Sequence, residues 1–454
     1  PVARRIAGGW TRPFREDTEG GIFYGWWMVG AGFLMKLVYA LLVFQAFGAY
    51  VAVLREEFEW SKTLFAAAFA MSRVESGALG PLQGWMVDRF GPRRVMQIGV
   101  VIMALGFFWF SQINSPEMFV LSFFTVSLGA GLAGFMTLTI AVVKWFERRR
   151  ATALGLMSTG MAVGGLLIPL LILALDTFGW RDTALASGVI VLLIGFPISL
   201  VMRTAPEEHG HHVDGRRDLS TGQARRAPQP DFTARQALCT RAFWFVSLGH
   251  ASAVLIVSAV MVHLIVYVSE DLGYSLGFAG ALVSLMTACM MVGQVGGGFV
   301  GDRVNKRLLV VGCMIGHVAG LLLLANATAL WMLLVFAIVH GLSWGTRGPQ
   351  MAAIRADYFG RTSFGTIMGF SSMIVMFGMM LGPIIAGAMA DATGSYTAGF
   401  TVLAAMAAAG SLFFVMARPP RRPLPIGAAA ARPAGAGHTE PARPAARGGT
   451  EGAR

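Results

Sequence analysis

The feature that most constrains this chain is a series of apolar runs, each long enough to cross a lipid bilayer. A hydrocarbon core about 30 Å thick requires about 20 helical residues. In the first half of the chain such runs lie near residues 25–54, 62–87, 93–112, 117–145, 152–176 and 183–203. In the second half they lie near residues 241–269, 277–300, 308–326, 331–355, 364–390 and 395–417. We therefore predict an all-α membrane protein with twelve transmembrane helices.

The composition excludes other classes of protein. Only 13% of the 454 residues are charged, whereas a soluble domain carries about 25%. The net charge of +12 lies in loops and tails between the apolar runs, so we expect no nucleic-acid partner. The cysteines Cys239, Cys289 and Cys313 have neither metal-site nor disulfide spacing. We also expect no cofactor and no enzymatic activity, because no P-loop, nucleophile or metal-ligand motif is found.

The basic residues lie in alternate loops, which predicts the orientation of the chain. Arg89, Arg93, Arg148 and Arg303 lie in one class of loops, and Glu57 lies in the other class. Both termini belong to the basic class, so we expect them to be cytoplasmic in a multi-pass protein of the inner (plasma) membrane. The predicted domains are an N-terminal segment 1–24, a six-helix bundle 25–203, a cytoplasmic linker 204–240, a second bundle 241–417 and a disordered tail 418–454.

An internal repeat divides the chain into two parts. The stretch from Gly84 through Asp88 to Arg94 recurs from Gly298 through Asp302 to Arg307, at a spacing of 214 residues. The same spacing relates Gly155 and Pro169 to Gly369 and Pro383. Such parallel repeats of six helices are typical of transporters whose halves are related by an axis along the membrane normal.

The repeated element, G-x-x-x-D-R-x-G-x-[RK]-[RK], resembles the signature between the second and third helices of the major facilitator superfamily. A glycine one turn before the aspartate allows close helix approach. The aspartate can sit at a neighbouring helix N-terminus or pair with an arginine at the cytoplasmic face, and the arginines can bind anionic lipid headgroups. The resemblance implies that the element is a gate contact, made and broken during transport. Asn305 replaces the closing glycine in the second copy, which predicts a weaker gate there. The predicted gating residues are Gly84, Asp88, Arg89, Gly91, Arg93, Gly298, Asp302 and Arg303.

Two segments of the first helix narrow the resemblance. Residues 19–27 and 47–61 are similar to the corresponding segments of bacterial monocarboxylate transporters and oxalate:formate antiporters. Animal monocarboxylate transporters carry a lysine in the first helix and an aspartate/arginine pair in the eighth. Here Gln45 stands near the place of the lysine, and Met290 and Gln294 stand at the places of the pair. The usual carboxylate-binding residues are therefore not where the resemblance would place them.

Ionisable residues inside the apolar runs are costly and indicate function. Arg73 lies 15 residues before Asp88 on a stripe with Gly77, Gly80 and Gly84, which we expect to face the other half. Its guanidinium could bind a carboxylate through two hydrogen bonds or form a salt bridge between the halves.

Three further charges and a tyrosine are candidates. Lys36 could bind an anion or pair with Glu75, and Glu75 could carry a proton or neutralise a neighbouring cation. Arg347, before Gly348 and Pro349, is a candidate second cation of the cavity. Tyr50 is a further candidate for substrate binding.

His263 is a candidate proton carrier because histidine titrates near neutral pH; the alternative is a packing residue with satisfied ring nitrogens. His317 and His340 rank below it.

The resulting hypothesis is a secondary transporter, monomeric in the lipid bilayer, that moves a small organic anion, a monocarboxylate, by alternating access. Proton symport follows from the resemblance. Two alternatives stay open: efflux of amphipathic compounds, which the aromatic and methionine-rich helices would suit, and a non-transporting membrane sensor with the same fold.

Overall fold

A computed structural model describes residues 22–215 and 231–421 of the chain. The helices of its first part are α2 Tyr24–Tyr39, α3 Ala46–Phe58, α4 Lys62–Ala78, α5 Gly80–Phe90, α6 Pro92–Phe110, α7 Pro116–Ala133, α8 Phe135–Trp145, α9 Arg150–Leu166, α10 Ile168–Ile190 and α11 Phe196–Val201. Those of its second part are α12 Ala234–Leu238, α13 Arg241–Val266, α14 Leu276–Gly301, α15 Lys306–Ala325, α16 Leu330–Phe359, α17 Phe364–Thr393 and α18 Tyr396–Met416.

These helices make twelve crossings, as predicted. Ten segments of the described chain are long and apolar enough to cross a membrane. One of them, Arg150–Val201, runs for 52 residues and is interrupted at Gly179, where φ is +77°, so it supplies two crossings. The helices α4 and α5 together supply the last crossing; its hydropathy is lower because it contains Arg73 and Glu75.

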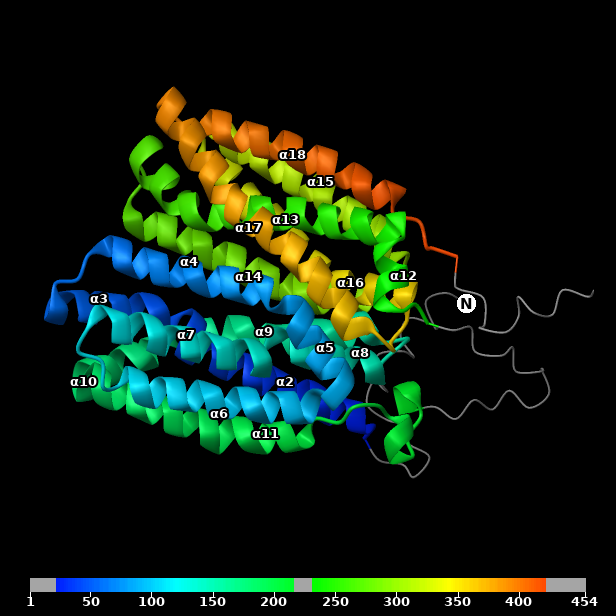
Figure 1. The fold of residues 1–454 in the computed structure, drawn as a ribbon. Helices are drawn as coiled ribbons and strands as arrows, with labels where there is room; N and C mark the ends of the chain where they lie inside the picture. The colour runs from blue at the N-terminus through cyan, green and yellow to red at the C-terminus, as the bar shows by residue number, and fades with distance from the viewer. Residues whose placement is uncertain (1–21, 216–230, 422–454) are drawn as a thin grey trace, which may run out of the picture.

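The crossings form two sets of six, which we call the first half (Tyr24–Val201) and the second half (Arg241–Met416). Figure 1 shows α2, α6 and α11 on one side of the molecule and α13, α15 and α18 on the other. The linker helix α12 and the last turn of α18 lie at the same end of the bundle (Figure 1). We call this end, where Asp88 and Asp302 also lie, the motif end.

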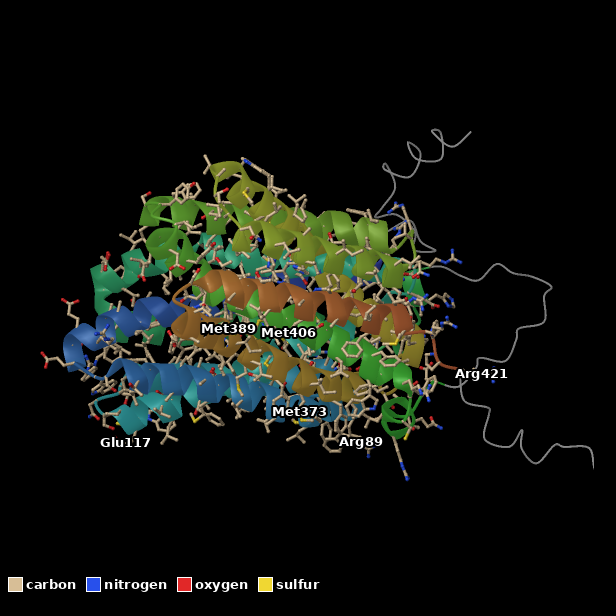
Figure 2. All side chains as sticks on the ribbon, turned by 90° about the horizontal axis from the view of Figure 1, so that it is seen from above. Arg89, Glu117, Met373, Met389, Met406 and Arg421 are labelled. Carbon is tan, nitrogen blue, oxygen red and sulfur yellow. The ribbon has the colours of Figure 1, made fainter. Side chains whose placement is uncertain are left out.

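Charged side chains distinguish the two ends. Figure 2 shows Arg89 and Arg421 at the motif end and Glu117 at the opposite end. This separation agrees with the alternation of basic and acidic loops in the sequence.

The most extensive contacts between the halves are made by two helix pairs, α5 with α17 and α9 with α14. Glycines permit both contacts. A Cβ atom added at Gly84 would overlap the carbonyl oxygen of Gly365, and one added at Gly155 would overlap the carbonyl oxygen of Gln294. Gly77 and Gly80 face Met376 and Gly369 of α17 in the same way. The prediction that the glycine stripe of the second crossing faces the other half is therefore confirmed.

The two copies of the repeated element end their loops differently. Gly91 starts α6 with a φ of +83°, a conformation that favours glycine. Asn305 starts α15 instead with an ordinary φ of −65°, and its Oδ1 accepts hydrogen bonds from the amides of Arg307 and Leu308 at 3.0 and 3.3 Å. The asparagine thus replaces the glycine turn with an N-cap.

The helix α16 passes through Pro349 without ending. The linker also contains more structure than a polar stretch suggests, since α12 and two short turns, Glu207–His209 and Val213–Gly215, lie within 204–240. The predicted segments 1–24 and 418–454 fall mostly outside the described residues, as does the middle of the linker.

Candidate functional site

The repeated aspartates each cap a helix of the other half. Asp88 Oδ1 accepts from the amide of Gly365 at 3.1 Å, and Oδ2 accepts from the amide of Thr366 at 2.8 Å. Asp302 accepts from the amides of Ala151 and Thr152, both at 2.9 Å. A carboxylate at a helix N-terminus satisfies free amides and interacts favourably with the helix dipole. The expected position of Asp88 at a neighbouring helix N-terminus is confirmed.

Ion pairs strengthen the same end. Lys144 Nζ lies 3.5 Å from Asp88 Oδ1, Arg150 of the first half pairs with Asp357 of the second, and Arg361 donates to the carbonyl of Lys144 at 2.7 Å. At the opposite end, charged groups pair within their own half: Glu57 with Arg181 at 2.6 Å, for example. In the described ranges, the hydrogen bonds and ion pairs between the halves thus gather at the motif end.

The other gating candidates surround these contacts. Arg89 and Arg93 are exposed, and Gly91 is buried at the turn between α5 and α6. Arg303 is exposed and donates to the carbonyl of Phe299 at 2.7 Å. Burial raises the pKa of the Asp302 carboxyl above its usual value, and the hydrogen bonds from Thr152 and Ala151 partly offset that effect.

The linker supplies a second pair of caps that the sequence did not indicate. Asp214 accepts from the amides of Glu147 and Arg148 at 3.2 and 2.8 Å. Asp231 accepts from the amides of Arg361 and Thr362 at 2.8 and 3.1 Å. The capped residues are again 214 positions apart. The connection from α8 to α9 is therefore held by Asp302 of the second half and by Asp214 of the linker. The connection from α16 to α17 is held by Asp88 of the first half and by Asp231 of the linker.

Near the middle of the bundle, Lys36 of α2 lies between α8 and α9. Its side chain is 2% exposed, its Nζ donates to Ser158 Oγ at 3.1 Å, and it lies 4.5 Å from the centre of the Phe135 ring. Lys36 is about 18 Å along the crossing from Tyr24, near the centre of a bilayer. The alternative of a Lys36–Glu75 pair is not what the structure shows, because Nζ is turned towards Ser158.

Ser158 connects Lys36 to the boundary between the halves. It lies one turn beyond Gly155 on α9, and Gly155 touches the backbone of Gln294 on α14. Gln294 Oε1 is buried without a hydrogen-bond partner in the structure. The two interfaces differ here, because Gly80 occupies the equivalent position in the first half. The Lys36–Ser158 contact thus lies about one turn along α9 from the place where Gly155 touches Gln294 of α14.

Arg73 and Glu75 lie further from the motif end. The guanidinium carbon of Arg73 is 4.4 Å from the centre of the Phe69 ring and 5.0 Å from that of Phe44. These rings belong to the first half, so the salt bridge between halves considered for Arg73 is replaced by cation–π contacts. Glu75 is buried at 6% exposure, and neither of its carboxylate oxygens has a hydrogen-bond partner in the structure.

Arg347 does not join this group. It is 1% exposed in α16, close to Cys313 of α15, inside the second half. Its Nε and Nη1 atoms have no hydrogen-bond partner in the structure. Ala352 and Ala356 of the same helix pack against the first half, whereas Arg347 lies among groups of the second half.

Tyr50 and His263 also lie away from Lys36. Tyr50 is 4% exposed, packs against Phe110 at 5.2 Å between ring centres, and lines a small apolar cavity within the first half. His263 Nε2 lies 2.9 Å from the carbonyl oxygen of Pro383, and Nδ1 lies 3.1 Å from the Tyr396 hydroxyl. A neutral ring satisfies both contacts, which fits the packing alternative for His263.

The comparisons with known proteins settle the family. The sequence profile described as Major Facilitator Superfamily matches residues 30–279 and 246–447. The chain belongs to the major facilitator superfamily. Human monocarboxylate transporter 11 is 29% identical over 428 residues, covering 87% of this chain and 83% of the relative. Rat monocarboxylate transporter 13 is 28% identical over 408 residues, covering 87% and 89%. The chain is therefore a multi-pass membrane transporter of this superfamily.

Solved structures of the superfamily share the fold. The E. coli fucose:proton symporter superposes with a TM-score of 0.66 at 14% identity, covering 86% of this chain and 99% of that one. The human organic anion transporter TETRAN gives a TM-score of 0.65 at 16% identity, covering 85% and 98%. At these identities the likeness confirms the twelve-helix fold.

Sequence reasoning missed several residues at the motif end and around Lys36. Ser158, Phe135, Asp214 and Asp231 are ordinary polar or aromatic residues with no motif around them. Gln294 was noted only as a departure from the relatives. His317 and His340 were ranked low, although the structure places them together, with Nδ1 atoms 3.2 Å apart.

Proposed function

We propose that this chain moves a small organic anion, a monocarboxylate, across the membrane by alternating access. The observation that carries the proposal is Lys36: a buried lysine near the bilayer centre whose hydrogen bond goes to a neutral hydroxyl. A cation in the hydrocarbon region is costly without a counter-charge. A bound carboxylate would supply that charge, which favours an anionic substrate.

The residues around Lys36 suit a small carboxylate. Ser158 can donate to a carboxylate oxygen, and the amide of Gln294 can donate from the second half across the α9–α14 contact. Phe135, which is 57% exposed, offers an apolar face beside Nζ for a short carbon chain. Arg73, about 10 Å further from the motif end along the helix direction, would attract the anion towards Lys36. Arg347 and Tyr50 lie too far inside their own halves to belong to this site.

We propose proton symport with Glu75 as the proton-carrying group of the first half. A buried carboxylate without hydrogen-bond partners is more stable when protonated, because burial penalises the charged form. His263 is not included, since both of its ring nitrogens have partners.

We further propose that the motif end faces the cytoplasm, with both termini there, in the inner (plasma) membrane. The basic loops at this end support that orientation. The contacts of Asp88 and Asp302 would then close the cytoplasmic side, and their rupture would open it. The proposed unit is a monomer, because the site lies between two halves of one chain.

The test is counterflow and uptake in proteoliposomes with formate, acetate, pyruvate, lactate and oxalate, with and without a pH gradient. We expect saturable uptake of at least one monocarboxylate. Lys36→Ala should reduce it about 100-fold, the loss expected for a charged hydrogen bond of up to about 3 kcal/mol. Lys36→Arg should keep measurable uptake, since it keeps the charge.

Two outcomes would contradict the proposal. Unchanged uptake by Lys36→Ala would remove Lys36 from the site. Absence of transport of every carboxylate, together with protection of cells against a cationic amphipathic drug, would favour the efflux alternative. Glu75→Gln should keep counterflow and lose about tenfold of the accumulation per pH unit of gradient, the share of one coupled proton. Undiminished accumulation would exclude Glu75 as a proton carrier.

A further inference from the structure

Two histidines of the second half face each other in its interior. His317 on α15 and His340 on α16 are each 0% exposed. Their Nδ1 atoms are 3.2 Å apart, and their ring centres are 4.5 Å apart at an angle of 67°. The Nε2 atoms of both rings are buried without a hydrogen-bond partner in the structure.

The Nδ1–Nδ1 contact fixes the proton count of the neutral pair. One ring must donate its Nδ1–H, and the other must accept at a bare Nδ1. The donating ring therefore has a bare Nε2, and the accepting ring carries its hydrogen on Nε2. One nitrogen of the pair is thus free to bind a second proton, which would produce an imidazolium that donates to a neutral imidazole. Hydrogen bonds from a charged donor are stronger than neutral ones.

The surroundings of the pair contain no counter-charge. Arg347 lies two turns along α16 from His340, its charge acts on both rings, and two of its own nitrogens are unpartnered. Acidic residues in the described second half lie at helix ends, as Asp302, Asp357 and Asp391 do. The other titratable groups on the helices packed around α15 and α16 form two sets. Within the spans lie Cys313 on α15, Cys289 on α14, His250 and His263 on α13, and Arg355 on α16. At helix ends lie Lys306 and Arg307 on α15, Tyr358 on α16, Arg241 on α13, Arg150 on α9, Lys144 on α8 and Tyr396 on α18.

This arrangement links the proton to an anion. An additional proton on the neutral pair adds a positive charge near Arg347. The repulsion between that charge and Arg347 is offset when a negative charge enters the protein. A bound carboxylate and a bound proton therefore favour each other, and by linkage the effect is reciprocal.

We propose that His317 and His340 form a proton-binding pair that takes up one proton, at the free Nε2, as the anion binds. The coupling of this proton to an anion rests on the function proposed above. The pair would be a second proton site, in the second half, independent of Glu75. Its proton is released when the anion leaves.

The transport test uses His317→Gln, His340→Gln and the double variant in proteoliposomes at zero membrane potential. Each coupled proton supports about tenfold accumulation of substrate per pH unit of gradient, because one pH unit is worth 1.36 kcal/mol. We expect the variants to keep counterflow of the carboxylate most active in the unsubstituted protein, and to lose about tenfold of accumulation per pH unit. His263→Gln is the matched control and should keep full accumulation.

Full accumulation by the double variant would overturn the proposal. Absence of counterflow in the unsubstituted protein would instead overturn the proposed anion function. A second measurement would then test whether His317 and His340 bind a proton. In ¹⁵N-histidine NMR of the full chain in detergent micelles with the panel of carboxylates present, we expect a coupling between the two Nδ1 atoms and conversion of one ring to imidazolium as the pH falls from 8 to 5. Two rings that stay neutral across this range would overturn the proposal, whatever the transport result.

Discussion

Lys36 and His250 occupy equivalent places in the two halves, 214 residues apart in the first crossing of each, yet they have different surroundings. His250 Nδ1 lies 3.1 Å from Nη2 of Arg355, and Arg355 also binds Ser371 and the carbonyl of Met351. Lys36 has the hydroxyl of Ser158 alone as its hydrogen-bond partner in the described structure. The second half fills this place with hydrogen-bond partners of its own, whereas in the first half Lys36 has one neutral partner, which is the difference on which the proposed anion site rests.

The two interfaces between the halves also combine equivalent contacts with one position that differs. Asp88 and Asp302 make equivalent contacts at equivalent helix ends, so the frame of the repeat is symmetric. About two turns before these aspartates, Gly80 faces Gly369 in the first interface, whereas Gln294 faces Gly155 in the second. The duplication preserved the packing glycines and diverged at the positions that would contact a substrate.

The largest expected effect comes from exchanging the residues of the first comparison. His250→Lys places a second cation against the buried Arg355 and should lower the free energy of unfolding by about 3 kcal/mol. Lys36→His keeps a possible hydrogen bond to Ser158 and should change the free energy of unfolding far less. Thermal unfolding in detergent compares the two variants; equal melting temperatures would contradict the assignment of His250 as a neutral acceptor.

Gly84→Ala tests the symmetric frame. The added Cβ would overlap the carbonyl oxygen of Gly365, so closure at the motif end becomes unfavourable. We expect about a tenfold loss of counterflow, equivalent to about 1.4 kcal/mol, and greater labelling of a cysteine introduced at the motif end. Gly48→Ala is the control, because no atom lies within 4 Å of its added Cβ. Equal counterflow in both variants would mean that the close approach at Gly84 is not needed.

Removing one gate carboxylate at a time compares the two copies of the repeated element. Asp88→Asn should weaken closure by about 1–2 kcal/mol, since it loses a helix-capping charge and the Lys144 contact. Asp302→Asn should weaken it less, in keeping with the weaker second gate predicted from Asn305. Spin-label distances across the motif end measure the closed population. A larger effect for Asp302→Asn would reverse this ranking.

The smallest expected effect tests the divergent position. Gln294→Gly makes the second interface resemble the first, removes one donor from the proposed site, and leaves the helix contact intact. The half-saturating carboxylate concentration should rise about fivefold, the value of one neutral hydrogen bond of about 1 kcal/mol. The maximal rate should change little. An unaltered half-saturating concentration would remove Gln294 from the site.

The sequence by itself determined the architecture. Apolar runs of bilayer length fix the number of crossings because water-free hydrocarbon forces the backbone into helices. The repeat around Asp88 and Asp302 revealed the two halves, and the glycine stripe from Gly77 to Gly84 predicted which face would meet the other half. These are periodic or repeated patterns, which are legible in one dimension.

Only the tertiary structure decided which buried charges are satisfied. Lys36, Arg73, Glu75 and Arg347 are all isolated charges in apolar runs, yet the structure gives them different surroundings. Lys36 meets a hydroxyl and Arg73 meets two aromatic rings, while Arg73, Glu75 and Arg347 each have buried atoms without a hydrogen-bond partner. The pairing of His317 with His340, and of Asp214 and Asp231 with equivalent loops, joins residues that share no motif. Partners of this kind are set by helix rotation and crossing over distances that sequence spacing does not encode. The apolar runs therefore determined the number and repeat of the crossings, and side-chain packing determined the partners of the buried charges.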